Sequence, residues 1–191
     1  MPLRKLYSRK TKSVLVLIIG LLLLIAQERG WLDSARQTAT RNQPGLYAVT
    51  RFVDGDTLVV DMNGREETIR MIGVDTPETH KPDTPVQCYG PAAAAYTKNL
   101  IGDQRLRLEA DETNQNRDRY GRLLRYVYLP DNRLISLELI RNGYGFAYTS
   151  FPFTKTAEFT AAETAAKAEN KGLWGNCTVT DENGRKQTNA E

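Results

Sequence analysis

Residues 46–73 read LYAVTRFVDGDTLVVDMNGREETIRMIG, and this stretch decides the fold. Its β-branched and aromatic residues fall into three runs, which predict strands over 46–52, 57–62 and 66–73. Asn63-Gly64 separates the last two runs and is typical of a two-residue hairpin turn. The sequence therefore predicts an antiparallel meander of three strands at the start of the folded domain.

Two more strands and three helices are predicted after this meander. Residues 105–110 and 123–129 alternate like further strands. The helices are expected over residues 91–101, 134–142 and 156–171, with Pro or Gly at their boundaries. This order of elements alone indicates a single domain of the α+β class.

The N-terminus has a different character. Five basic residues precede an unbroken apolar run over residues 14–26, VLVLIIGLLLLIA. Such a run is typical of a secretory signal peptide or of a short membrane anchor, so residues 1–26 are expected to be one or the other. Basic flanks stay on the cytoplasmic side, and the domain is therefore expected to be exported, either secreted or anchored to the outer face of the cytoplasmic membrane.

Two polar segments flank the predicted domain. Residues 27–44 show no sustained period and are expected to be a linker. Residues 177–191 are equally polar and are expected to be a disordered tail. Residues 45–176 remain for the single domain.

The charge balance of the domain argues against a broad basic surface. The whole chain has 26 Lys and Arg against 23 Asp and Glu, a formal net charge of +3. Because the five basic residues before the apolar run have no acidic counterpart, residues 27–191 keep 21 basic against 23 acidic side chains, a net charge of −2. Binding of nucleic acid would therefore depend on a local cluster of basic residues.

Three short motifs place acidic and Arg residues at turns beside the predicted strands. They are DGDT at residues 54–57, Arg70 followed by VDTPE at 74–78, and DRYGR at 118–122. Carboxylate oxygens bind hard cations, and the planar guanidinium of Arg pairs with a phosphate through two hydrogen bonds. Each motif alone is also typical of an ordinary turn. Together they indicate a site for a metal ion and a phosphate, suited to phosphoryl transfer.

The same motifs in the same order, with Tyr89-Gly90-Pro91 before an Ala-rich helix, resemble those of the staphylococcal nuclease family. The resemblance extends from about residue 46 to residue 174. It implies a β-barrel, a five-stranded OB-fold with about three helices. It also implies a Ca²⁺-dependent nuclease that hydrolyses DNA, preferably single-stranded, with RNA as a further substrate and little sequence specificity. A monomer is expected by default.

The resemblance also implies roles for individual residues. Asp56, Asp75 and the backbone carbonyl of Thr76 are the implied calcium ligands. Glu78 is the implied general base, or at least the residue that orients the attacking water. Arg70 and Arg122 are the implied phosphate clamps.

Two tyrosines are candidates for contact with substrate. Tyr120 is expected to bind a terminal phosphate or to line the nucleotide site. Tyr148 either stacks on a base or is a half-buried packing residue, and the sequence leaves both interpretations open.

Cys88 and Cys177 are the only cysteines. In an exported protein they are expected to form one disulfide, with two free thiols as the alternative.

A different class of function also stays open, namely a catalytically silent OB module that binds nucleic acid or protein at the cell surface. The complete set of acidic and Arg residues favours the enzyme, because a pure binding module would not need it.

Overall fold

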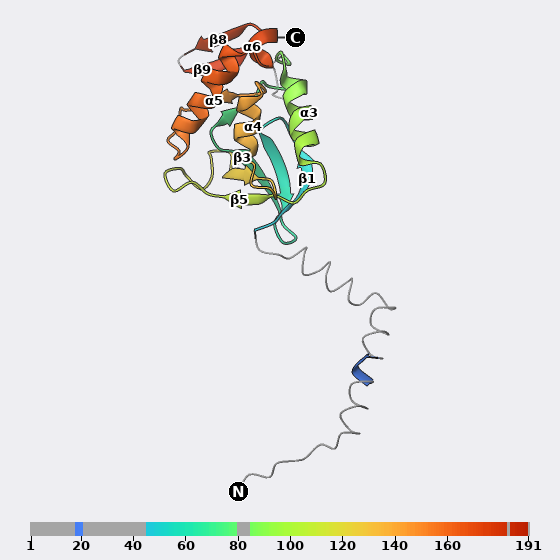
Figure 1. The fold of residues 1–191 in the computed structure, drawn as a ribbon. Helices are drawn as coiled ribbons and strands as arrows, with labels where there is room; N and C mark the ends of the chain where they lie inside the picture. The colour runs from blue at the N-terminus through green and yellow to red at the C-terminus, as the bar shows by residue number, and fades with distance from the viewer. Residues whose placement is uncertain (1–17, 21–44, 80–84, 183, 191) are drawn as a thin grey trace. The chain divides into compact units, whose positions relative to one another are not determined.

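The computed structural model describes residues 18–20, 45–79, 85–182 and 184–190 (Figure 1). The chain divides into two units, Met1–Gln43 and Pro44–Glu191. In the first unit only residues 18–20 are described, and they are helical. The predicted signal peptide or anchor and the predicted linker therefore lie almost wholly outside the described residues. Among the described residues, no helix combines the length and the apolar character needed to cross a membrane.

The second unit is built on a mixed sheet of five strands in the order β1-β2-β3-β6-β5. Neighbouring strands pair antiparallel except β3 and β6, which are parallel. These are the five strands that the sequence predicts. Asn63 and Gly64 have φ values of 60° and 89°, as the predicted hairpin turn requires. The strands are β1 (Ala48–Phe52), β2 (Thr57–Asp61), β3 (Glu66–Met71), β5 (Arg107–Glu109) and β6 (Leu123–Tyr128).

The two edges of this sheet meet at one place. Tyr47, just before β1, pairs with Leu106, just before β5, through two backbone hydrogen bonds of 2.8 Å. The sheet is therefore curled, in keeping with an OB-fold. A single bridge is not a continuous ladder, however, so the described pairings stop short of the closed barrel that the sequence led us to expect.

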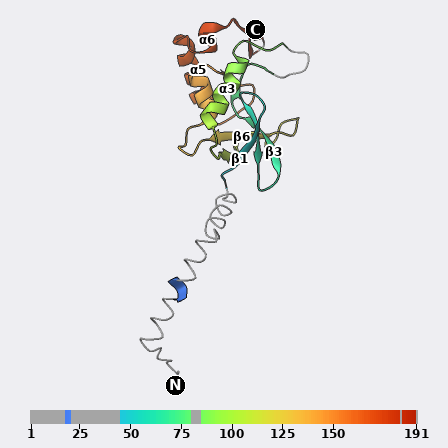
Figure 2. The same cartoon turned by 90° about the vertical axis from the view of Figure 1, so that its right-hand side faces the viewer.

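Helices pack beside the sheet. α4 lies between α3 and α5 (Figure 1), and the view from the side shows these helices toward one side of the domain and β3 toward the other (Figure 2). Leu58, Ile69, Leu139 and Phe159, from both layers, are fully buried in the core. The three predicted helices and one additional short helix are α3 (Gly90–Ile101), α4 (Ile135–Arg141), α5 (Thr156–Ala168) and α6 (Leu173–Asn176).

Two pairs of short strands lie outside the main sheet. β4 (Val74–Asp75) pairs with β7 (Phe146–Ala147), and β8 (Val179–Glu182) pairs with β9 (Arg185–Thr188) in a C-terminal hairpin. The first pair fixes the predicted metal ligand Asp75 against a segment far along the chain.

The prediction of a disordered tail at residues 177–191 is wrong. Lys186 of β9 forms an ion pair of 2.6 Å with Glu163 of α5, and the backbone amide of Cys88 donates to the carbonyl of Asn189 at 2.7 Å. A disulfide joins Cys88 to Cys177, with a Cα–Cα distance of 6.0 Å. The disulfide is the pairing that the sequence analysis expects of these two cysteines. The ion pair and the hydrogen bond are long-range, and a polar segment without hydrophobic period gives no sign of them in the sequence.

A buried carboxylate, Asp111, ties together three segments. It accepts hydrogen bonds from the backbone amides and the hydroxyls of Thr113 and Thr154 and from the hydroxyl of Tyr126, at 2.6–2.8 Å. Burial raises the pKa of Asp111, but the hydrogen bonds outweigh burial and hold this pKa well below its usual range. Asp111 is therefore a structural anchor for the loop that leads into α5.

Candidate active site

The centre of the site is an ion pair between the neighbouring strands β2 and β3. Asp56 directly precedes β2, and Arg70 of β3 is the register partner of Thr57. Nη1 of Arg70 lies 2.7 Å from Oδ1 of Asp56. Asp56 is only 3% exposed, and the same Oδ1 accepts the hydroxyl of Thr57 at 2.9 Å. The register of the hairpin therefore places the two opposite charges side by side in a buried position.

Asp75 of β4 and the next residue, Thr76, complete this group. Nη2 of Arg70 lies 2.7 Å from Oδ1 of Asp75, and Nη1 donates to the carbonyl of Val74 at 2.8 Å. The backbone amide of Thr76 donates to Oδ2 of Asp56 at 2.8 Å, and its hydroxyl lies 3.2 Å from the same oxygen. One guanidinium thus bridges two carboxylates. Asp56, Arg70, Asp75 and Thr76 are called the Asp–Arg cluster below.

Gly55 lets the turn between β1 and β2 pack against this cluster. A Cβ at this position would lie 2.8 Å from side-chain atoms of Thr76. The carbonyl of Gly55 accepts the hydroxyl of the buried Thr97 of α3 at 2.6 Å. The DGDT motif is thus a turn, as its ordinary interpretation predicts, and it also supplies the buried carboxylate of the cluster.

Asp54 is a third carboxylate at the cluster, and the sequence suggested no individual role for it. Burial raises the pKa of Asp54, and the charge of Asp56 raises it further. Burial also raises the pKa of Asp75, although Arg70 opposes this shift. Burial lowers the pKa of Arg70, but the carboxylates of Asp56 and Asp75 outweigh burial, and the net shift is upward. Arg185 also lowers the pKa of Asp75, but the three carboxylates still outnumber the two guanidinium groups, which leaves an excess of negative charge.

This excess of negative charge fits a divalent cation. The available donors are carboxylate and carbonyl oxygens, which suit a hard ion such as Ca²⁺. Asp56, Asp75 and the carbonyl of Thr76 would hold the ion. Within the part of the chain that the structure describes, no group of three or more acidic, His or Cys side chains is assembled to hold a metal. Both oxygens of Asp56 already have protein partners, so the set fits a weak site better than a preformed cage.

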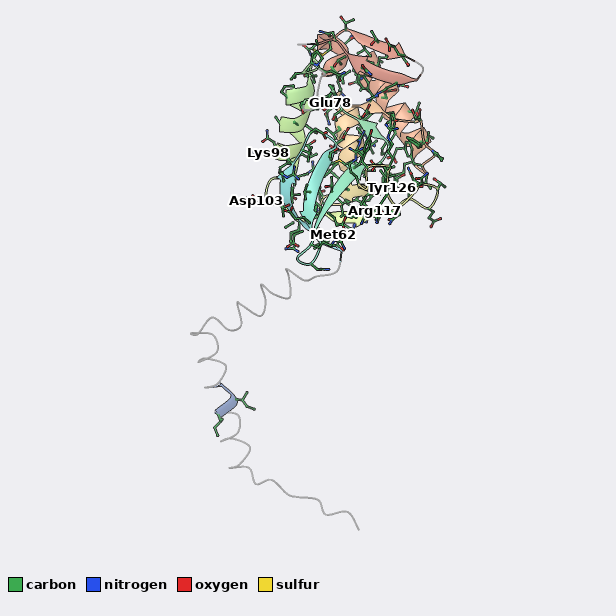
Figure 3. All side chains as sticks on the ribbon, turned by 180° about the vertical axis from the view of Figure 1, so that it is seen from behind. Met62, Glu78, Lys98, Asp103, Arg117 and Tyr126 are labelled. Carbon is green, nitrogen blue, oxygen red and sulfur yellow. A yellow bond between two sulfur atoms is a disulfide. The ribbon has the colours of Figure 1, made fainter. Side chains whose placement is uncertain are left out.

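Glu78 lies in the loop that follows β4. Its backbone amide donates to Oε1 of Gln87 at 2.8 Å, and its carbonyl accepts the backbone amide of Gln87 at 2.9 Å. Its carboxylate accepts the amide of Thr79 at 3.0 Å, and it is close enough to Asp75 to add to the effect of burial on the pKa of that group. Figure 3 shows Glu78 and Met62 toward opposite ends of the strands. The structure therefore places the predicted general base near the Asp–Arg cluster.

Arg122 and Tyr120 lie in the turn before β6. Nε of Arg122 is 2.7 Å from Oδ2 of Asp118, and its amide is 3.0 Å from Oδ1. Tyr120 is 68% exposed, and its ring centre lies 5.4 Å from the guanidinium carbon of Arg122. Because Leu124 pairs with Arg70 across β3 and β6, Arg122 is expected on the same face of the sheet as Arg70. Among the described residues, no hydrogen bond or ion pair joins Arg122 to the Asp–Arg cluster.

Tyr148 follows β7 and is half-buried. Its backbone amide donates to the carbonyl of Gly73 at 2.9 Å, and its ring centre lies 6.0 Å from that of Phe151. It is also close enough to Arg70 to act on that guanidinium electrostatically. Tyr148 therefore packs against Phe151 and borders the site, while its stacking on a base stays a prediction.

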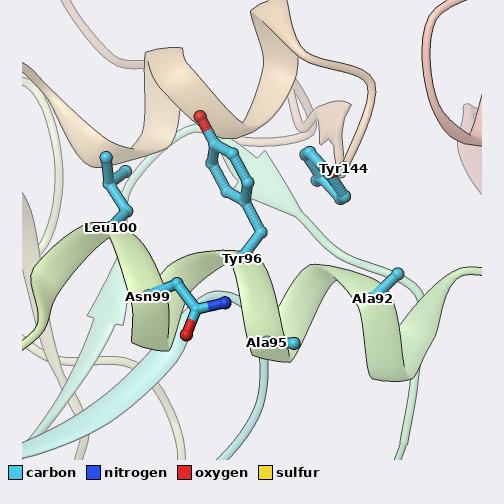
Figure 4. Close-up of a pocket in the computed structure, with 6 residues that line it drawn as sticks. All are labelled: Ala92, Ala95, Tyr96, Asn99, Leu100 and Tyr144. Carbon is cyan, nitrogen blue, oxygen red and sulfur yellow. The ribbon is translucent and has the colours of Figure 1, made fainter.

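An apolar groove of about 470 Å³ shares no residue with this site (Figure 4). Tyr96 of α3 stacks there on Tyr144, with ring centres 4.2 Å apart. No charged side chain lines the groove, so it lacks the carboxylates and guanidinium groups that the Asp–Arg cluster brings together. The charged residues, and not this hollow, locate the candidate active site. The groove is lined by Ala92, Ala95, Tyr96, Asn99, Leu100 and Tyr144.

Sequence reasoning missed three residues that support the site. The paired acids of the DGD sequence could have pointed to Asp54, and the spacing of four residues before Arg122 could have pointed to Asp118. Gln87 carries no local signal, because its contact with Glu78 depends on how the intervening chain returns.

The fold and the site together define the class of protein. Its curled β-sheet carries buried carboxylates and Arg residues, which are suited to binding a phosphodiester. Residues 68–176 match the family model described as staphylococcal nuclease homologue. The chain therefore belongs to the staphylococcal nuclease family.

Individual relatives agree with this assignment. A thermonuclease of Staphylococcus intermedius is 43% identical over 133 residues, which cover 70% of this chain and 77% of the relative. A thermonuclease of Staphylococcus hyicus is 38% identical over 170 residues, 87% of this chain and 98% of the relative. Endonuclease YncB of Bacillus subtilis is 41% identical over 139 residues, 71% of this chain and 65% of the relative.

Proposed function

We propose that this protein is a Ca²⁺-dependent nuclease that hydrolyses DNA, preferably single-stranded, and also RNA, with little sequence specificity. Its family membership identifies it as a nuclease and thus as a hydrolase. The observation that carries the finer proposal is the bridging of Asp56 and Asp75 by Arg70 at a buried position with excess negative charge. Such a position can take up both a cation and a phosphate.

The Asp–Arg cluster would bind the phosphate and the ion together. When bound by Asp56, Asp75 and the Thr76 carbonyl, Ca²⁺ would supply positive charge beside the phosphate oxygens. Arg70 would pair with the phosphate from a position that its two carboxylate partners fix. Its charge would stabilise the negative charge that grows on the phosphate oxygens in the transition state.

Glu78 would act on the attacking water, and Arg122 would act on the leaving oxygen. Glu78 would accept a proton from the water that attacks phosphorus in line with the leaving oxygen. Arg122, which is expected on the same face of the sheet as Arg70, would stabilise the leaving oxygen. Tyr120, exposed beside Arg122, would contact a terminal phosphate. Stacking of a base on Tyr148 would tolerate every base, in keeping with low specificity.

An exported, monomeric protein is the second part of the proposal. The apolar run at residues 14–26 supports export, either as a signal peptide or as an anchor to the outer face of the membrane. The disulfide between Cys88 and Cys177 supports it independently, because disulfides persist in oxidising compartments.

Cleavage of single-stranded DNA by the full chain, with Ca²⁺ and with chelator, tests the proposal. Glu78→Ala and Arg122→Ala should each lower the rate by about a hundredfold or more. Arg141→Ala and Glu158→Ala are matched controls, since they remove two exposed charges of α4 and α5, and should keep full activity. DNA that is bound but never cut would indicate the silent binding module instead.

A further inference from the structure

The disulfide reaches into the turn that precedes α3. Residues 87–90, Gln-Cys-Tyr-Gly, form a turn closed by a hydrogen bond of 2.9 Å from the amide of Gly90 to the carbonyl of Gln87. Tyr89 in this turn has a φ of 70°, which is unfavourable for a residue with a side chain. Cys88 is bonded covalently to Cys177, across a sequence separation of 89 residues. The turn is thereby tied to the segment that enters the C-terminal hairpin.

The C-terminal hairpin contacts the same turn. The amide of Cys88 donates to the carbonyl of Asn189 at 2.7 Å, and the hydroxyl of Thr188 donates to the carbonyl of Cys88 at 2.8 Å. Gln87 forms an antiparallel bridge with Ala190. One side of the turn is therefore held by a covalent bond and by several hydrogen bonds.

The other side of the turn holds Glu78. The backbone amide of Glu78 donates to the side chain of Gln87 at 2.8 Å, and the backbone carbonyl of Glu78 accepts from the amide of Gln87 at 2.9 Å. Gly90 packs closely behind, since a Cβ there would lie 2.9 Å from the carbonyl oxygen of Glu78. The main chain on both sides of the Glu78 side chain is thus fixed by this one turn.

We propose that Gln87 is a positioning residue for Glu78, and that the hairpin and the disulfide keep Gln87 in place. This inference rests on the catalytic role proposed above for Glu78. A carboxylate that takes a proton must lie within hydrogen-bond reach of the water, and a displacement of about 1 Å can lower a rate by about a hundredfold. The hairpin lies beyond residues 68–176, so this support is outside the region that matches the family model.

Substitution of Gln87 tests the positioning role. Gln87→Met keeps the length of the side chain but removes the acceptor, while Gln87→Glu keeps an acceptor oxygen. With single-stranded DNA and Ca²⁺, kcat should fall about tenfold in Gln87→Met, KM should change less than about twofold, and Gln87→Glu should recover kcat to within about threefold. Gln104→Met, in the exposed loop after α3, is the matched control and should keep full activity. An unchanged kcat in folded Gln87→Met would overturn the proposal.

The same substitution in a Glu78→Ala background separates this inference from the proposed function. If Gln87 acts through Glu78, Gln87→Met should lower the residual rate of Glu78→Ala by less than about twofold. A further loss of about tenfold in that background would overturn the positioning role and leave the role of Glu78 intact. Full activity of Glu78→Ala itself would overturn the proposed function instead.

A variant without the disulfide tests the support behind Gln87. Cys88→Ser/Cys177→Ser should lower kcat by about threefold or more at a temperature at which circular dichroism shows it folded. The loss should again vanish in the Glu78→Ala background. An unchanged kcat in the folded double variant would overturn the role of the disulfide, whatever the behaviour of the Gln87 variants.

Discussion

Replacement of Asp111 by Ala should destabilise the domain without touching the Asp–Arg cluster. The buried carboxylate accepts five hydrogen bonds from Thr113, Tyr126 and Thr154. Thr113 and Thr154 are exposed and can bond water instead, so they add little to the cost. The hydroxyl of the buried Tyr126 loses its charged acceptor. Since a hydrogen bond to a charged group contributes about 1.5–3 kcal/mol, the expected cost is about 1.5–3 kcal/mol.

Thermal unfolding followed by circular dichroism at neutral pH measures this cost. A loss of about 2 kcal/mol corresponds to a fall in Tm of about 6 °C for a domain of this size. Asp103→Ala is the matched control, because Asp103 is exposed in the loop after α3 (Figure 3), and it should shift Tm by less than about 2 °C. A fall in Tm for Asp111→Ala no larger than that of Asp103→Ala would refute the reasoning.

The carboxylate of Asp111 should also make the stability of the fold depend on pH. Burial raises the pKa of Asp111, but the hydrogen bonds outweigh burial. The pKa in the folded state therefore lies below the pKa in the unfolded state. Its stabilisation is therefore present above the unfolded pKa of about 3.9 and is lost as the pH falls toward the folded pKa. The wild type should lose stability more steeply than Asp111→Asn below about pH 4, and parallel curves for the two proteins would argue against this assignment.

Two further predictions concern the turn of the active site and the disulfide. Gly55→Ala should lower the rate of DNA cleavage by about tenfold or more. The new Cβ would lie 2.8 Å from the side chain of Thr76, so either the turn or Thr76 must move. A wild-type rate would show that the turn can relax. Reduction of the Cys88–Cys177 bond should lower Tm. The disulfide closes a loop of about 90 residues, which can stabilise the fold by as much as about 4 kcal/mol. A melting curve that is unchanged by reductant would contradict this.

Much of the fold could be predicted because its signals are local. The five strands and the three longer helices follow from short-range patterns, such as the Asn63-Gly64 turn between β2 and β3. The pairings that escaped prediction join residues far apart in sequence. The bridge between Tyr47 and Leu106, the pairing of β4 with β7 and the anchoring of the C-terminal hairpin depend on the path of the whole chain, which no local window contains.

The candidate site was predictable as a set of residues but not as an arrangement. Motif order selected Asp56, Arg70 and Asp75, whereas their bridging geometry follows from the register of β2 with β3 and from β4. Asp111 was not predictable, because a buried carboxylate with five hydrogen bonds has the same local sequence context as a solvated loop acid. Gln87 was not predictable either, because its local sequence gives no sign of its contact with Glu78.

The calcium dependence of single-stranded DNA cleavage, compared between the wild type and Asp75→Asn, tests most directly whether the Asp–Arg cluster holds the ion. The substitution keeps the shape of the side chain but removes one charge from the ligand set. The wild type should be inactive in chelator, and Asp75→Asn should need at least about tenfold more Ca²⁺ for half-maximal rate. An identical calcium requirement in the two proteins, or cleavage that persists in chelator, would contradict the account.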